Sequence, residues 1–155
     1  MIRFTALPTE AVRAYQSGAP DAYDLPPENA VSDGCGNLCR HCLRDIPKDA
    51  NFLILAHRPF AHLHPYAETG PIFLCAGSCA RYEDKGVIPP ILTTSPDYLI
   101  KGYSAQDRIV YGTGAVVAAQ DLQTSAEAIF KDPDGAYIHV RSSRNNCYQA
   151  RIDRG

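Results

Sequence analysis

The sequence AYIHVR at residues 136–141, followed by CYQARI at residues 147–152, decides the expected fold. Apolar and polar side chains alternate through both stretches, and this period of two is typical of β-strands with one buried face. The short polar segment between them fits the loop of a hairpin. The pattern therefore predicts an antiparallel sheet with one apolar face covered by another element.

The alternation also predicts a register for this hairpin. With residues 142–146 as the loop, one face is apolar throughout and the other is largely polar, and a slip of one residue would destroy that separation. The pairs expected on the apolar face are Val140–Tyr148, Ile138–Ala150 and Ala136–Ile152. Those expected on the polar face are Arg141–Cys147, His139–Gln149 and Tyr137–Arg151.

Outward from the hairpin, the remaining pattern predicts an α+β fold. Leu122, Ala126, Ile129 and Phe130 share one face of a helix that ends near Pro133. The sequence also predicts a short helix at 9–16, irregular chain from 18 to 36, and strands at 2–6, 52–56, 72–74, 98–103 and 108–118. We expect a single domain over residues 1–155, with an antiparallel or mixed sheet, one main helix packed on it and a short N-terminal helix.

Composition narrows the classes of function. The chain has 155 residues, 45% of them hydrophobic, and a formal net charge of −2, so no general basic field draws in nucleic acid or an anionic membrane. The sequence shows neither a signal-peptide pattern nor an apolar run long enough to span a membrane. We expect a cytoplasmic protein with reduced thiols and without nucleic-acid or membrane partners.

Cysteine spacing is the strongest chemical signal in the chain. Cys39 and Cys42 have the C-x2-C spacing of a metal-binding turn, and Cys75 and Cys79 form a slightly longer clip. Because thiolates suit zinc and zinc takes four ligands in a tetrahedron, these four residues predict one Zn2+ site, the only cofactor expected. The strands near 52–56 and 72–75 would bring the two clips together.

Two other interpretations of the cysteines remain. They could be reduced thiols packed as small hydrophobic side chains. The spacing of Cys35, Cys39 and Cys42 also matches the cluster-binding motif of radical S-adenosylmethionine enzymes. Those enzymes place it in a large, mostly parallel barrel, and this chain is too short and too antiparallel in pattern for that fold.

An alternative function uses the polar face of the hairpin. In the register above, Cys147 lies beside arginine, a setting that lowers a thiol pKa, with His139 as a candidate base and Arg141 as a candidate anion-binding group. The proline-rich loop at 57–71 is long enough to be functional. These residues suggest a small-molecule enzyme or a binder of a small anionic ligand, but a solvated outer face is the favoured interpretation, and enzymatic activity is left open.

Several motifs together resemble a known family. They are CRHCLRD at 39–45, PYAETGPIF at 65–73, IHVR at 138–141 with Asn146-Cys147, and the arginine-containing terminus at 151–154. The chain resembles the bacterial family catalogued as domain of unknown function number twelve hundred and three. This resemblance implies a small bacterial protein with no assigned activity.

The resemblance also bears on the metal ligands. It implies that counterparts of Cys39, Cys79 and Cys147 are frequent, that a counterpart of Cys42 is common but absent from some members, and that Cys35 and Cys75 are less typical. It leaves Cys147 or Cys35 open as the fourth ligand in place of Cys75. A site present in only some members would not be what makes the fold.

Overall fold

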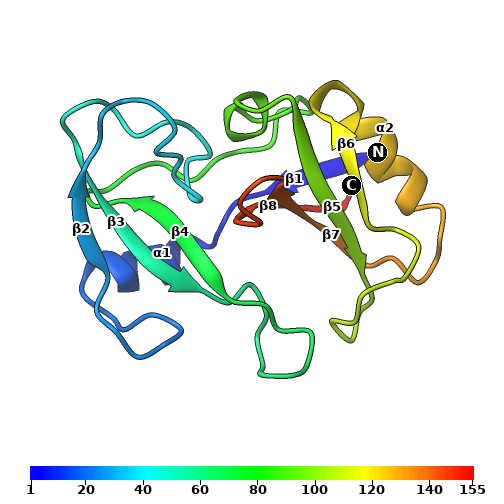
Figure 1. Ribbon diagram of the computed structural model, residues 1–155, viewed down its shortest axis with the longest axis horizontal. Coiled ribbons are helices and arrows are strands. Elements are labelled where there is room, and N and C mark those ends of the chain that lie inside the picture. The colour runs from blue at the N-terminus through cyan, green and yellow to red at the C-terminus, as the bar shows by residue number, and fades with distance from the viewer.

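Two antiparallel sheets organise the molecule in the computed structural model, which describes residues 1–155 (Figure 1). The larger sheet has the order β1-β8-β7-β5-β6 and the smaller sheet the order β2-β3-β4. The strands are β1 (Ile2–Thr5), β2 (Glu28–Val31), β3 (Asn51–His57), β4 (Gly70–Cys75), β5 (Asp97–Tyr103), β6 (Ala115–Ala118), β7 (Tyr137–Ser142) and β8 (Tyr148–Arg154). The helices are α1 (Thr9–Gln16) and α2 (Leu122–Ile129), with short 3-10 turns η1 (Pro90–Thr93) and η2 (Ala119–Asp121).

The larger sheet packs its apolar face against α2. Ile138 and Val140 of β7 and Ile152 of β8 are fully buried against Leu122 and Ala126 of the helix. The helix therefore covers the face that the alternating sequence marks as apolar. The expected α+β class, with one main helix on an antiparallel sheet and a short N-terminal helix, is confirmed.

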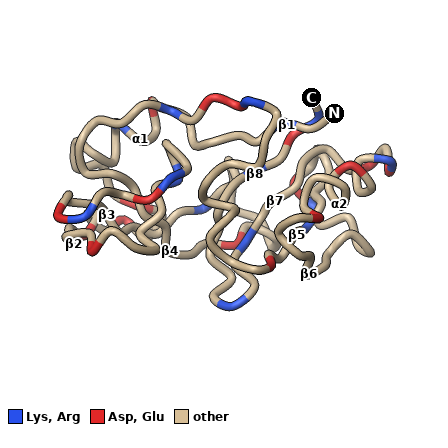
Figure 2. Tube along the Cα trace, turned by 90° about the horizontal axis from the view of Figure 1, so that it is seen from above, with Lys and Arg blue, Asp and Glu red and all other residues tan.

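The smaller sheet forms a second core with α1 and the cysteine-containing turn. Leu53 and Leu55 of β3 and Leu74 of β4 pack with Val12 of α1 and with Cys39. The chain leaves the larger sheet after β1, forms the smaller sheet, and returns to the larger sheet at β5. Strand β1 pairs with β8, and the two ends of the chain therefore lie side by side (Figures 1 and 2). In the sequence, the smaller sheet is thus inserted between β1 and β5 of the larger sheet.

The hairpin register differs from the expected one. His139 lies opposite Arg151, not Gln149, because a bulge between Val140 and Arg141 leaves Gln149 as an extra residue in β8. The observed pairing is shifted by two residues from the expected one, which keeps each side chain on the same face of the sheet, so the hairpin still has an apolar face. Tyr148 is the exception, since it lies opposite Arg141 and packs into the core of the smaller sheet.

The polar face of the hairpin is buried, so the favoured expectation of a solvated outer face is wrong. His139, Arg141 and Tyr137 are 1%, 3% and 4% exposed. The loop at 58–69 covers them, and Glu68 in this loop lies 2.5 Å from Lys101 Nζ and 3.0 Å from Arg141 Nη2. This face forms the seam between the larger sheet and the loop.

The exterior carries charges of both signs. Figure 2 shows Lys and Arg interspersed with Asp and Glu along the chain, and the formal net charge is −2. None of the helices has the length and apolarity that a membrane crossing requires.

Candidate metal centre

A tight turn at residues 39–44 presents the first pair of cysteines. The Leu43 amide donates to the Cys39 carbonyl at 2.9 Å, and the Cys39 amide donates to the Arg44 carbonyl at 3.0 Å. Leu43 closes the turn in the left-handed region, with φ of 55°, and is fully buried. A non-glycine residue is held in that conformation only where its surroundings impose it, and such residues gather at ligand-binding turns.

The second pair of cysteines lies where β4 ends. Antiparallel pairing places Cys75 opposite Phe52 of β3, and a parallel bridge joins Phe73 to Cys39. The bridge from Phe73 therefore holds the end of β4 beside the turn that carries Cys39. Helix α1 then holds the segment after β4 because Gln16 Nε2 donates to the carbonyls of Cys75 and Gly77, at 2.8 and 2.9 Å.

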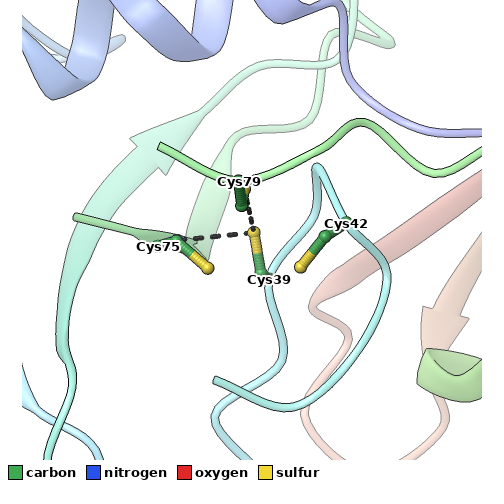
Figure 3. Close-up of side chains that lie close together, drawn as sticks. All are labelled: Cys39, Cys42, Cys75 and Cys79. Carbon is green, nitrogen blue, oxygen red and sulfur yellow. Dashed lines mark hydrogen bonds between the residues drawn. The ribbon is translucent and has the colours of Figure 1, made fainter. Parts of the chain in front are cut away.

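The four sulfur atoms of Cys39, Cys42, Cys75 and Cys79 all lie within 4.8 Å of one another. Figure 3 shows their side chains converging from the turn and from the end of β4. Zn–S bonds of about 2.3 Å in a tetrahedron place sulfurs about 3.8 Å apart, whereas a disulfide needs about 2.0 Å. The Cys39 and Cys79 sulfurs are 4.0 Å apart, so the donor set fits a tetrahedral ion after a small contraction.

Backbone groups favour negative charge on Cys39. The amides of His41 and Cys75 both donate to its sulfur at 3.4 Å. Hydrogen bonding from the Cys42 and Cys75 thiols, reinforced by the backbone amides of Cys42 and Cys75, outweighs burial and holds the pKa of Cys39 well below its ordinary value.

The other three thiols resist ionisation. Hydrogen bonding to Cys39 raises the pKa values of Cys42 and Cys75, and burial followed by the charges of Cys39 and Cys42 raises the pKa of Cys79 to about 12. Four thiols this close cannot all lose their protons without a cation among them. A divalent ion would supply the missing charge, and Cys39, Cys42, Cys75 and Cys79 are the residues that could hold it.

A polar relay supports the cluster from outside. His41 Nδ1 lies 3.1 Å from the Cys79 sulfur, and His41 Nε2 lies 2.9 Å from Thr9 Oγ1 at the start of α1. Burial lowers the pKa of His41, so the neutral ring is the favoured form. Arg13 of the same helix donates to the Cys79 carbonyl at 3.0 Å. Such outer contacts orient metal ligands.

The remaining cysteines lie outside the cluster. Cys35 is exposed and does not join Cys39 and Cys42, so the three-cysteine motif of a radical enzyme is not assembled. Cys147 is half-buried and donates to the Asn145 carbonyl at 3.7 Å. The fourth sulfur of the group is therefore that of Cys75, and neither Cys35 nor Cys147 takes its place.

Of the three candidate catalytic residues, His139 and Arg141 lie on the same face of β7, and Cys147 lies apart from His139. Arg141 is paired with Glu68, and His139 lies in an aromatic cluster, 4.8 Å from Tyr103 and 5.1 Å from Phe60 between ring centroids. Cys147 lines a different cleft from His139. The structure does not bring a thiol, a base and an anion-binding group together here.

Sequence reasoning missed the residues that support the cluster. His41 is the one with a signal in the sequence, because it lies inside the C-x2-C turn. The contacts of Arg13 and Gln16 depend on how α1 packs against the segment after β4, and no local sequence pattern predicts that packing.

These features define an α+β protein with two antiparallel sheets and a four-cysteine cluster at the end of the smaller one. The chain belongs to the family described as "Protein of unknown function (DUF1203)", whose model matches residues 36–154 and so includes all four clustered cysteines. The resemblance seen in the sequence is thereby confirmed. No curated protein and no solved structure matches the chain.

Proposed function

We propose that this protein is a zinc-binding module in which Cys39, Cys42, Cys75 and Cys79 hold one Zn2+ as thiolates. The observation that carries the proposal is the mutual approach of the four sulfurs within 4.8 Å, from two segments far apart in the sequence. The zinc would join the 39–44 turn to the end of β4.

The role we propose for the metal is structural. A site with four cysteine ligands is closed, since it keeps no position for water or substrate. Bound zinc stabilises the folded state by mass action, and a concentration a thousand times the dissociation constant contributes about 4 kcal/mol. The chain is long enough to bury a core without the metal, so we expect the apo protein to fold but with lower stability.

Metal analysis of protein purified without a histidine tag tests this proposal. We expect one equivalent of zinc per chain in the wild type, loss of the metal in Cys39→Ser, and retention in Cys35→Ser. Cys35 is the matched control because it is an exposed cysteine outside the cluster.

Three outcomes would contradict the proposal. The first is a metal-free wild type in which all four cluster thiols react with a thiol reagent. The second is a disulfide among these residues in protein extracted under reducing conditions. The third is a coloured preparation in which iron occupies the four-cysteine site. Chelation gives a second measurement, since removing zinc should lower the melting temperature by roughly 10 °C for a chain of this size.

A further inference from the structure

Buried polar atoms without hydrogen-bond partners gather in one part of the molecule, away from the cysteine cluster. Apart from Arg141 Nη2 and Glu68 Oε2, which form an ion pair with each other, there are seven of them, and all belong to the seam between the larger sheet and the chain that runs from the end of β3 to β4. The residues concerned are His57, His64, Tyr103, His139, Arg141 and Gln149. Native proteins pair nearly all buried polar groups, so such a concentration calls for a partner from outside the chain.

A cleft of about 460 Å3 opens onto this seam. Its walls include His139, which is 1% exposed with an unpartnered Nδ1, and His57, whose two ring nitrogens are both buried and unpartnered. The volume lies within the range of small-molecule sites. Leu7 and Phe60 add apolar surface to the same cleft.

Four arginines line this cleft and only one carboxylate does. The arginines are Arg3, Arg58, Arg81 and Arg151, and they come from β1, the loop after β3, the segment after the cysteine cluster, and β8. We call this the arginine cleft.

The one carboxylate, that of Asp153, is already engaged. It accepts hydrogen bonds from Thr5 Oγ1 at 2.6 Å and from Arg151 Nε at 2.7 Å. The other arginines have no acidic partner in the cleft, and most of their N–H donors remain free. Arg81 donates once, to the Ala6 carbonyl at 2.7 Å, and Arg58 once, to the Phe60 carbonyl at 3.3 Å.

Three arginines, Arg3, Arg58 and Arg81, therefore bring positive charge without an acidic partner to a cleft that is also lined by neutral imidazoles with unpaired nitrogens. Burial, followed by nearby arginine charges, lowers the pKa values of both His57 and His139, so the histidines act as hydrogen-bonding groups and not as further cations. Guanidinium groups bind carboxylates and phosphates through paired N–H donors, and a bound anion would relieve their mutual repulsion.

We propose that the arginine cleft binds a small organic anion that carries a carboxylate or a phosphate. The arginines hold the anionic group, His57 and His139 bond to a polar group of the ligand, and its apolar part packs on Leu7 and Phe60. The site is separate from the cysteine cluster and does not depend on the proposed zinc.

Titration followed by NMR of the histidine ring signals tests this proposal, with inorganic phosphate and citrate as probes at constant ionic strength. We expect saturable shifts of the His57 and His139 signals, with a dissociation constant below about 1 mM for at least one probe. A response to phosphate alone indicates a phosphate ester as the natural ligand, and a response to citrate alone indicates a carboxylate.

The double variant Arg3→Gln/Arg58→Gln should weaken binding at least about tenfold by removing two charge-assisted contacts. Arg144→Gln is the matched control, since Arg144 is an exposed arginine on the β7–β8 hairpin, outside the cleft. Both changes affect exposed or half-buried side chains, so folding is expected to persist. Unmoved histidine signals with both probes, or equal affinities in the two variants, would overturn the proposal.

Discussion

His41 is the residue whose two ring nitrogens connect the cysteine cluster to α1. We predict that His41→Phe, which keeps the ring but removes both hydrogen bonds, lowers zinc affinity by roughly ten- to a hundredfold because the Cys79 sulfur loses its orienting partner. Competition with a chromogenic zinc chelator measures the change.

A milder variant serves as a control, because it removes only the hydrogen bond between His41 and Thr9. Thr9→Val removes only the outer hydrogen bond and should produce a smaller loss than His41→Phe. Equal affinities for wild type and His41→Phe would show that the relay does not support the metal.

His57 gives the stability of this protein a specific dependence on pH. Burial, with the charges of Arg40, Arg141 and Arg58, lowers its pKa in the folded state to about 4, against about 6.5 in an unfolded chain. Below pH 6.5 the unfolded state binds a proton that the folded state does not, so stability falls with decreasing pH until about pH 4.

We predict that His57→Gln removes this dependence. The free energy of unfolding of the wild type should fall by up to about 3 kcal/mol more than that of the variant between pH 7 and pH 4. Urea denaturation of both proteins in buffers without phosphate checks the difference, in which the contributions of His139 and the carboxylates largely cancel. Parallel curves for the two proteins would contradict it.

At the scale of elements, α1 is the support of the second cysteine pair. We predict that Gln16→Ala weakens zinc binding roughly tenfold, since the carbonyls of Cys75 and Gly77 lose their donor. Gln120→Ala is the matched control, because Gln120 is exposed in η2. Alanine favours helix, so loss of α1 itself would not be the cause, and equal affinities in the two variants would refute this role.

The elements that the sequence predicts well are those with a clear period. Residues 9–16 form the expected helix, α2 lies where the helical spacing of apolar residues places it, and the strands of the β7–β8 hairpin lie where alternation places them. The sequence predicts no strand between residues 18 and 36, yet β2 is there. Its residues are exposed or half-buried, so it has no apolar alternation and is held by backbone pairing to β3.

The predicted strand at 108–118 is too long for a different reason. Only Ala115–Ala118 form β6, because Gly112 adopts a left-handed conformation, with φ of 95°, that interrupts an extended chain. Isolated glycines within a strand pattern do not show from sequence whether they break it.

Cysteine spacing identifies the four residues of the cluster, because they form two pairs, Cys39 with Cys42 and Cys75 with Cys79, whose members are close in the sequence. The arginine cleft could not be found in this way. Its arginines come from both ends of the chain and from two loops, and only the pairing of β1 with β8 and the docking of the two sheets bring them together.

At the scale of the whole molecule, Arg40 ties the two sheets together. It is 5% exposed, donates to the Tyr148 carbonyl of β8 at 2.7 Å and to the Leu38 carbonyl at 2.5 Å, and its amide donates to Phe73 of β4. Burial lowers its pKa to about 10, which still leaves it charged at neutral pH.

We predict that Arg40→Met destabilises the protein by roughly 2–4 kcal/mol, because two buried carbonyls lose their donors. The neighbouring Arg44→Met is the control, and it should change stability by less than about 0.5 kcal/mol since Arg44 is exposed. Urea unfolding midpoints with unchanged slopes measure both effects. Similar midpoints for the two variants would show that the buried arginine does not hold the sheets together.

The insertion of the smaller sheet between β1 and β5 has a consequence for synthesis on the ribosome. The four clustered cysteines and β2 to β4 lie within residues 28–79, so these residues can assemble with α1 once residue 79 has left the exit tunnel. Strand β1 must remain unpaired until β8 emerges, because β8 is its only neighbour in the sheet. A nascent chain stalled near residue 120 should therefore already bind the proposed zinc while its first strand remains free.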